Sequence, residues 1–299
     1  MPAIEIQDLA KNYGSIKALQ GVSLSVEKGQ IYGLLGRNGA GKTTLVKILL
    51  SIVRATEGCA RLLDRDVPST ASRERVGYLP EDHRFPDYHT AGSLLDFLGG
   101  LSGMGRQRRC VRIPELLDLV SMREWQHEKI RKYSKGMRQR VGIAQALLHD
   151  PDVVFLDEPT DGVDPVGRKQ IRDVIVDLKA HGKTVFVNSH LLSEVELVSD
   201  RVAILDKGKI VREGTVDSLT RRSNVWEIRI EGPFGAKFDA IQKAFPQVRV
   251  IEGGLAAELP GAAELNALID LLRSLELRIV GVAERRLTLE EAFLQAVAP

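Results

Sequence analysis

A glycine-rich turn between a predicted strand and a predicted helix constrains this chain more than any other feature. Residues 36–43 have the sequence GRNGAGKT, which fits the pattern G-x-x-x-x-G-K-[ST]. An apolar stretch at residues 30–35 predicts the strand, and residues 43–50 carry apolar side chains at helical spacing. Glycines let backbone N–H groups wrap phosphate oxygens, and a helix N-terminus adds partial positive charge. The turn is therefore a candidate phosphate-binding loop.

The residue types in this loop indicate a nucleoside triphosphate, ATP, as the ligand. Lys42 would place a positive charge on the β- and γ-phosphates, and Thr43 would offer its hydroxyl to Mg²⁺. The alternative is an incidental glycine-rich turn, which the Lys-Thr pair and the flanking elements disfavour. The candidate ATP-binding residues here are Gly36, Arg37, Asn38, Gly39, Ala40, Gly41, Lys42, Thr43 and Thr44.

A second motif, which is acidic, lies far downstream of the glycine-rich loop. Residues 153–158 form an apolar strand that ends in Asp157 and Glu158. Asp157 can reach the metal through water, and Glu158 is placed to polarise an attacking water molecule. Alone, this pattern also fits an ordinary strand followed by a solvated acidic turn. Together with the phosphate loop, it predicts hydrolysis of Mg²⁺-ATP.

The order of predicted elements indicates an α/β fold. Strands are predicted at residues 153–156, 184–187 and 202–205, with a helix at residues 168–180. Such strand–helix–strand alternation implies a mostly parallel sheet with helices packed on it. The stretch from about residue 88 to residue 150 is predicted to be largely helical, with a helix starting at Pro114.

The chain of 299 residues is long for one domain, and its pattern restarts after a seam at residues 219–224. We therefore predict a domain at 1–220, with a helical subdomain at about 86–150, and a small α+β domain at 221–299. In the second domain, strands and helices are predicted in the ferredoxin-like order β-α-β-β-α-β, at residues 225–230, 235–245, 248–251, 255–259, 262–275 and 277–283. Thr288 and Glu291 have the spacing of a capping box, which predicts a last helix.

Composition excludes several classes of protein. The 42 basic and 40 acidic side chains nearly balance, which gives no support to nucleic-acid binding or a polybasic membrane surface. Cys59 and Cys110 are far apart, so we expect free thiols in a reducing cytosol. The N-terminal residues predict no signal peptide, and no apolar run approaches the roughly 18–20 residues of a membrane span. We expect a cytoplasmic chain that serves a membrane only through a partner.

Residues 133–140, YSKGMRQR, resemble the signature motif of ATP-binding-cassette (ABC) ATPases, which is usually Leu-Ser-Gly-Gly-Gln. The segment keeps Ser134 and Gly136 but carries Tyr133, Lys135 and Met137. Three other segments resemble family motifs in the same order and spacing, over residues 4–215: the aromatic that stacks on adenine at Tyr13, the Walker B motif running into the D-loop at residues 157–165, and the switch histidine at His190.

The resemblance implies a mechanism. Two cassettes would sandwich two ATP molecules, with Ser134 and the Gly136 N–H facing the γ-phosphate bound by the other subunit. His190 would hold the γ-phosphate and the attacking water, and Glu158 would be the general base. Glu81 stands where the family has the Q-loop glutamine. A carboxylate there can still coordinate Mg²⁺, although a solvated loop acid is the alternative.

The resemblance also implies a function: the ATP-hydrolysing subunit of an exporter-type ABC transporter, under a separate membrane permease. Its second cassette would be another copy of this chain or a different ATPase subunit. One alternative is a soluble ABC ATPase of translation or repair, which usually carries two cassettes or a long insertion. Another is a regulatory subunit that does not hydrolyse ATP, which is expected to lack the catalytic glutamate. This chain keeps Glu158.

Overall fold

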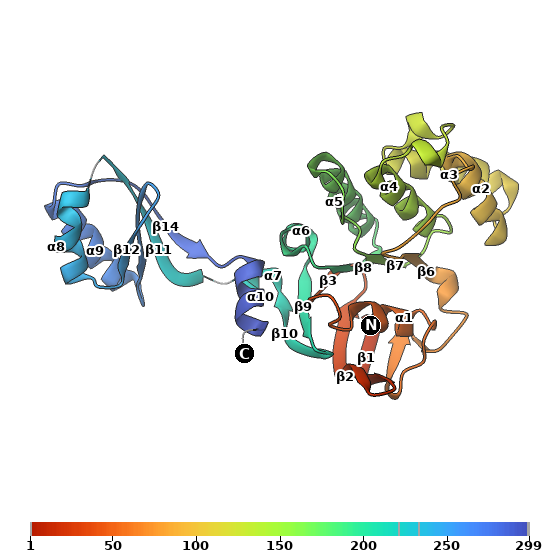
Figure 1. Ribbon diagram of the computed structural model, residues 1–299, viewed down its shortest axis with the longest axis horizontal. Coiled ribbons are helices and arrows are strands. Elements are labelled where there is room, and N and C mark those ends of the chain that lie inside the picture. The colour runs from red at the N-terminus through yellow and green to blue at the C-terminus, as the bar shows by residue number, and fades with distance from the viewer. Residues whose placement is uncertain (1, 221, 233, 298–299) are drawn as a thin grey trace. The chain divides into compact units, whose positions relative to one another are not determined.

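A computed structural model describes residues 2–220, 222–232 and 234–297 (Figure 1). The chain divides into two compact units. The first runs to Val216 and takes in the chain again from Phe293, and the second spans Asp217–Ala292. Arg221, the predicted first residue of the second domain, lies outside the described residues. None of the helices in the described residues has the length and apolar character needed to cross a membrane.

A six-stranded sheet forms the centre of the first unit. Its strand order is β10-β9-β3-β8-β7-β6, in which only the β9–β10 pairing is antiparallel. The strands are β3 (Ile31–Leu35), β6 (Val76–Leu79), β7 (Val153–Asp157), β8 (Thr184–Ser189), β9 (Arg201–Asp206) and β10 (Lys209–Thr215). Every residue of β3, β7 and β8 is buried, as expected for a parallel sheet covered on both faces. The predicted strands at residues 153–156, 184–187 and 202–205 are confirmed as β7, β8 and β9.

One face of this sheet packs on α1 (Lys42–Leu49) and on a second, antiparallel sheet of order β2-β1-β4-β5. The strands of that sheet are β1 (Pro2–Tyr13), β2 (Ile16–Glu27), β4 (Glu57–Leu62) and β5 (Arg65–Asp66). A continuous core joins side chains of both sheets to Leu45 and Leu49 of α1. The predicted helix at residues 43–50 is confirmed, and this core fixes its position at the end of β3.

Helices cover the opposite face of the central sheet, as Figure 1 shows for α5 and α6. The elements on this side are α4 (Lys135–Ala146), α5 (Pro165–Ala180) and α6 (Leu192–Val198). The stretch between β6 and β7 is helical, as predicted, with α2 (Ala91–Leu101), α3 (Arg106–Leu119), α4, η2 (Arg123–Trp125) and η3 (Ile130–Lys132). Two short helices, η1 (Arg73–Arg75) and α7 (Val216–Leu219), complete the order along the chain up to the second unit.

The prediction that a helix starts at Pro114 is wrong, because α3 begins at Arg106 and carries Pro114 in its interior. A proline inside a helix removes one backbone N–H and the i→i−4 hydrogen bond that it would donate. Ile113, Leu116 and Leu117 of α3 are buried around this position. Tertiary packing of these side chains therefore outweighs the local cost of the proline.

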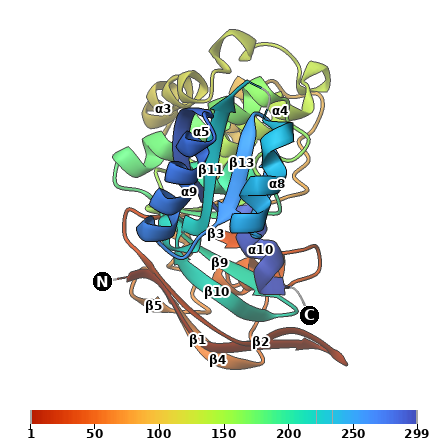
Figure 2. The same cartoon turned by 90° about the vertical axis from the view of Figure 1, so that its left-hand side faces the viewer.

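The second unit has the predicted element order β-α-β-β-α-β. Its elements are β11 (Arg222–Glu231), α8 (Gly235–Ala244), β12 (Val248–Ile251), β13 (Gly254–Glu258), α9 (Ala262–Ser274) and β14 (Arg278–Arg286). The antiparallel strand order is β12-β13-β11-β14, and Figure 2 looks onto α8 and α9 beside β11 and β13. Ile228, Leu255 and Leu268 belong to a core of this unit's own.

The last helix, α10 (Leu289–Val297), begins with the predicted capping box. The Thr288 N–H donates to Glu291 Oε2 at 3.0 Å, and the Glu291 N–H donates to Thr288 Oγ1 at 3.2 Å. The division between the two units falls within this helix.

Candidate active site

The glycine-rich loop leaves β3 and leads directly into α1. Gly41 has a φ of 112°, and a Cβ there would lie 2.5 Å from the Ala18 carbonyl oxygen. A Cβ on Gly36 would lie 2.5 Å from the Leu205 carbonyl oxygen. Glycine is therefore needed at both positions for the loop to pack against the start of β2 and the end of β9. No described side chain caps α1, so its first N–H groups are free to bind an anion.

Lys42 is buried and turns back toward its own loop. Its ammonium group donates to the Gly36 carbonyl at 2.7 Å and lies 3.8 Å from Glu158 Oε1. Burial lowers the pKa of Lys42, while the carboxylates of Glu158 and Asp157 act in the opposite direction. The lysine charge thus lies between the loop that would hold phosphate and the acids at the end of β7.

A cavity of about 410 Å³ lies over the loop. Predicted site residues from three segments line it: Arg37, Asn38, Gly39, Gly41, Lys42, Thr43, Thr44, Glu81, Asp157 and Glu158. Ile16, Lys17 and Ala18 at the start of β2 also line it, and they were not predicted from the sequence.

The sheet order explains why these segments meet. β3, β8, β7 and β6 are parallel neighbours, so their carboxyl ends share one edge of the sheet. The loop follows β3, His190 follows β8, Asp157 ends β7 and Glu81 lies just after β6. Ligands of open α/β sheets bind at this edge.

Asp157 combines a hydrogen-bonded oxygen with an unpartnered one. Asn188 Nδ2 donates to Oδ1 at 2.6 Å, and within the described residues the buried Oδ2 has no hydrogen-bond partner. Burial raises the pKa of Asp157 to about 6, and the Glu81 charge adds to the effect. A buried acceptor of this kind fits a cation. The described residues contain no group of three or more His, Cys, Asp or Glu side chains that could hold a metal alone. A metal here would need further ligands, as Mg²⁺ does when it binds with phosphates.

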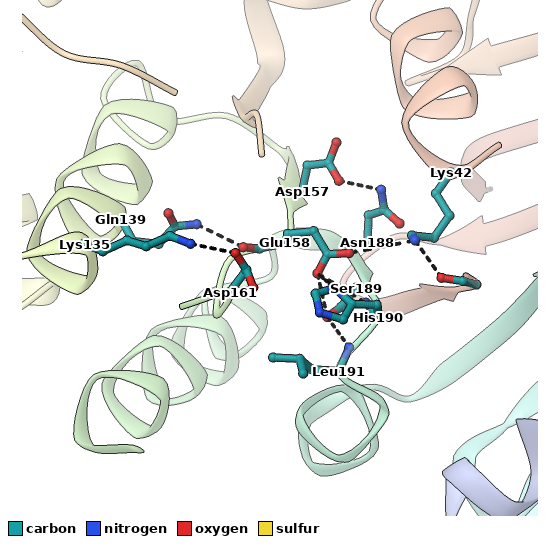
Figure 3. Close-up of polar contacts among 11 residues, drawn as sticks. Lys42, Lys135, Gln139, Asp157, Glu158, Asp161, Asn188, Ser189, His190 and Leu191 are labelled. Carbon is teal, nitrogen blue, oxygen red and sulfur yellow. Dashed lines mark hydrogen bonds and ion pairs between the residues drawn. The ribbon is translucent and has the colours of Figure 1, made fainter. Parts of the chain in front are cut away.

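The carboxylate of Glu158 makes several polar contacts with residues at the end of β8 and directly after it, as Figure 3 shows. Its side chain is only 4% exposed and its φ is 51°, an unusual value for a residue other than glycine. Oε2 accepts hydrogen bonds from the Ser189 hydroxyl and the His190 N–H, both at 3.2 Å. The His190 ring nitrogen Nδ1 lies 2.8 Å from the same oxygen.

The remaining predicted residues lie apart from the cavity lining. Tyr13 ends β1, is 45% exposed and stacks under the Lys11 ammonium at 5.0 Å. Ser134 caps α4, with its hydroxyl oxygen accepting from the Met137 N–H at 3.2 Å, and Gly136 lies in the first turn of that helix. The His190 ring lies beside Glu158, and Ala40 is buried inside the loop.

Two side chains that hydrogen-bond to Glu158 were not predicted from the sequence. Ser189 directly precedes His190 at the end of a buried strand, and that position was the only available signal. Gln139 of α4 donates to the Glu158 carbonyl at 3.2 Å, and Lys135, one turn earlier, pairs with Asp161 at 2.6 Å. The i, i+4 spacing places Lys135 and Gln139 on one helix face, but only the fold shows what that face meets.

A phosphate loop, a buried aspartate with a free oxygen and a buried glutamate at one edge of a parallel sheet define a P-loop nucleotide-binding fold. A family model described as ABC transporter matches residues 19–161. An uncharacterised ABC transporter ATP-binding protein of Synechocystis sp. is 41% identical over 282 residues, which are 94% of this chain and 78% of that protein.

A daunorubicin resistance ATP-binding protein of Streptomyces coeruleorubidus is 34% identical over 299 residues, covering 98% of this chain and 95% of that protein. Among solved structures, an ATP-binding subunit of an ABC transporter superimposes with a TM-score of 0.66 at 27% identity, covering 73% of this chain and 92% of that one. The chain belongs to the ATP-binding subunits of ABC transporters, a family that hydrolyses ATP to power transport.

Proposed function

We propose that two cassettes, this chain and a second copy, close on two ATP molecules and thereby drive export through a separate permease. The observation that carries the proposal is the separation of Ser134 and Gly136 from the chain's own cavity, which Lys42 and Glu158 line. The signature motif lies at the N-terminus of α4, where backbone N–H groups favour binding of an anion. The γ-phosphate of ATP bound to a second subunit would be that anion.

Within one site, each residue has a distinct task. Lys42 and the loop N–H groups hold the β- and γ-phosphates. Thr43 and Asp157, with Glu81 nearby, would hold Mg²⁺, which would neutralise charge on the phosphate oxygens. Glu158 accepts a proton from the attacking water, and His190 contacts the γ-phosphate. Tyr13 stacks on adenine.

The transport partner is proposed to be a transmembrane permease, which would hold this chain at the cytoplasmic face of the membrane. The relative named for daunorubicin resistance is similar over nearly the whole chain, which favours export as the direction. A second cavity, of about 630 Å³, adjoins the helical subdomain and is lined by Pro80 and Asp82. Glu81, between them, lines the nucleotide cavity. A partner bound in the second cavity would therefore be linked to the bound nucleotide through residues 80–82.

Affinity purification from solubilised membranes tests this partner. The full chain should recover one polytopic membrane protein. A photocross-linker at Tyr88, which lines the second cavity, should capture that protein, while one at the exposed Val250 of β12 should not. Recovery of the chain without a membrane protein would favour the soluble ABC ATPase.

The ATP-bound dimer is tested with Glu158→Gln. Glutamine keeps the shape of the side chain but cannot take the proton of water, so ATP binding should survive. Turnover should fall by roughly 10²–10⁴-fold, as is typical when a general base is lost. The apparent mass in sizing chromatography should double with ATP and Mg²⁺.

Two further variants control this experiment. Ser134→Arg in the Glu158→Gln background should abolish the dimer, because a bulky side chain would block the signature face. Glu57→Gln, on the exposed part of β4, should behave as the unaltered chain. Wild-type turnover in Glu158→Gln would remove Glu158 as the base. A variant that stays monomeric with ATP would show that closure needs the permease or a different second cassette.

A further inference from the structure

We infer that Ser189 is a positioning residue for hydrolysis: its hydroxyl fixes which oxygen of Glu158 accepts the proton. The inference rests on the proposed role of Glu158 as the base. It adds a residue that the phosphate-loop, signature and switch-histidine motifs do not assign.

The two carboxylate oxygens of Glu158 have different surroundings. The Ser189 hydroxyl, the His190 N–H and the His190 ring all approach Oε2, at 3.2, 3.2 and 2.8 Å. Oε1 lies 3.8 Å from the ammonium group of Lys42, which itself lines the nucleotide cavity. Because three contacts engage the lone pairs of Oε2, Oε1 is the oxygen left to accept a proton from water.

The fold holds the backbone of Glu158 in place from two directions. Its N–H donates to the Asn188 carbonyl at 2.8 Å, which continues the pairing of β7 with β8. Its carbonyl accepts from Gln139 of α4 at 3.2 Å (Figure 3). The Glu158 side chain is 4% exposed, so packing restricts its first two torsions, and the torsion of the carboxylate itself has the broadest, roughly two-fold energy profile. Hydrogen bonds to one oxygen are what select a single orientation.

Among these donors, Ser189 is the side chain that can stay in place through the reaction. It is 1% exposed, and its oxygen accepts from the Leu191 N–H at 3.0 Å, which orients its own proton toward Glu158. The His190 side chain is 41% exposed and must turn to the γ-phosphate in the proposed mechanism. Once it turns, Ser189 and the His190 backbone N–H are left to hold Oε2.

The test compares Ser189→Ala with Ser189→Thr in steady-state ATP hydrolysis. Alanine should lower kcat roughly ten- to a hundredfold, the range for one hydrogen bond to a charged group, with KM and ATP affinity unchanged. Threonine keeps the hydroxyl and should restore most of the activity. Ser72→Ala is the matched control, because Ser72 is equally buried and its hydroxyl donates to the Ser69 carbonyl at 3.0 Å.

A double-mutant cycle separates this inference from the proposed function. If Ser189 acts through Glu158, Ser189→Ala should have no further effect on turnover in the Glu158→Gln background. Unchanged kcat in Ser189→Ala overturns the Ser189 inference and leaves Glu158 as the base. Loss of ATP affinity together with a lowered Tm would also overturn it, by showing a structural role. Wild-type turnover in Glu158→Gln alone would instead overturn the proposed base.

Discussion

Lys42 is the residue whose loss should most directly affect ATP binding. Its buried ammonium group donates to the Gly36 carbonyl and faces Glu158, so its charge is already desolvated and aimed at the cavity. Charge-assisted contacts to phosphate of this kind contribute roughly 1.5–3 kcal/mol. Lys42→Ala should therefore weaken ATP binding by about ten- to a hundredfold or more. Titration with a fluorescent ATP analogue measures this, with Lys47→Ala of the same helix as the control.

Equal affinity of Lys42→Ala and the unaltered chain would contradict the phosphate-loop assignment. The loop could be recognised from sequence because its chemistry needs contiguous residue types, and a strand and a helix flank it. Ser189 and Gln139 could not, because their contacts with Glu158 depend on the pairing of β7 with β8 and on the orientation of α4. A motif can be recognised from neighbouring residues in the sequence, whereas the contacts of Ser189 and Gln139 with Glu158 arise from tertiary packing.

At the scale of elements, Asp150 joins three segments of the first unit. It lies between α4 and β7, its Oδ1 accepts from Lys183 Nζ at 2.7 Å, and Arg112 Nη2 of α3 is 3.7 Å from the same oxygen. The hydrogen bond from Lys183 holds the pKa of Asp150 below its usual value, although burial acts in the opposite direction. A carboxylate whose pKa is lowered by folding stabilises the folded state at pH values above its pKa in the unfolded chain, which is about 4 for an aspartate. This contribution is lost as the pH falls through its pKa in the folded state.

Asp150→Asn should therefore be less stable than the unaltered chain at pH 7. Because the carboxylate is half exposed, the difference in the free energy of unfolding should stay below about 1 kcal/mol. It should shrink as pH falls below about 4. Urea denaturation at pH 7, 4 and 3 measures it, with Asp87→Asn in an exposed loop as the control. A difference that does not change with pH would show that Asp150 acts through packing and not through its charge.

Elements with a clear apolar period could be predicted from the sequence, and short or distant ones could not. β6 has four residues and β5 has two, too few for a period to stand out. The second sheet depends on β1 pairing with β4, far along the chain, and a local pattern does not specify that partner. Pro114 shows the reverse case: proline favours the start of a helix, but here it lies inside α3 because its neighbours in that helix are buried.

At the scale of the whole molecule, the second unit carries a core of its own. Side chains of α8, α9 and the four-stranded sheet, including Ile241, Leu272 and Ile230, are buried together. A domain of this size buries a smaller share of its surface than a large one and is only marginally stable. The first unit has a larger core that spans two sheets and α1. The first unit should therefore be able to fold without the second.

A fragment ending at residue 220 should thus fold and bind ATP with the affinity of the full chain, but should unfold at a lower temperature. The chain from Phe293 groups with the first unit, and the fragment lacks it. Phe293 is 8% exposed, and burying one such side chain contributes about 1.5–3 kcal/mol. For a unit of this size, that corresponds to a Tm lower by roughly 3–12 °C. Circular dichroism gives the Tm, and the fluorescent ATP analogue gives the affinity.

The fragment lacks both the second unit and the end of the chain from Phe293, and either loss could lower its Tm. Two variants of the full chain show which of the two losses is responsible. Phe293→Ala should reproduce much of the lower Tm, because it leaves a cavity where a large ring was buried. Leu294→Ala, on the same helix but 59% exposed, should leave Tm nearly unchanged. If the two variants behave alike, α10 does not stabilise the first unit. If the fragment itself is unfolded by circular dichroism, the boundary near residue 220 is wrong, and the chain beyond it is needed for the first unit to fold.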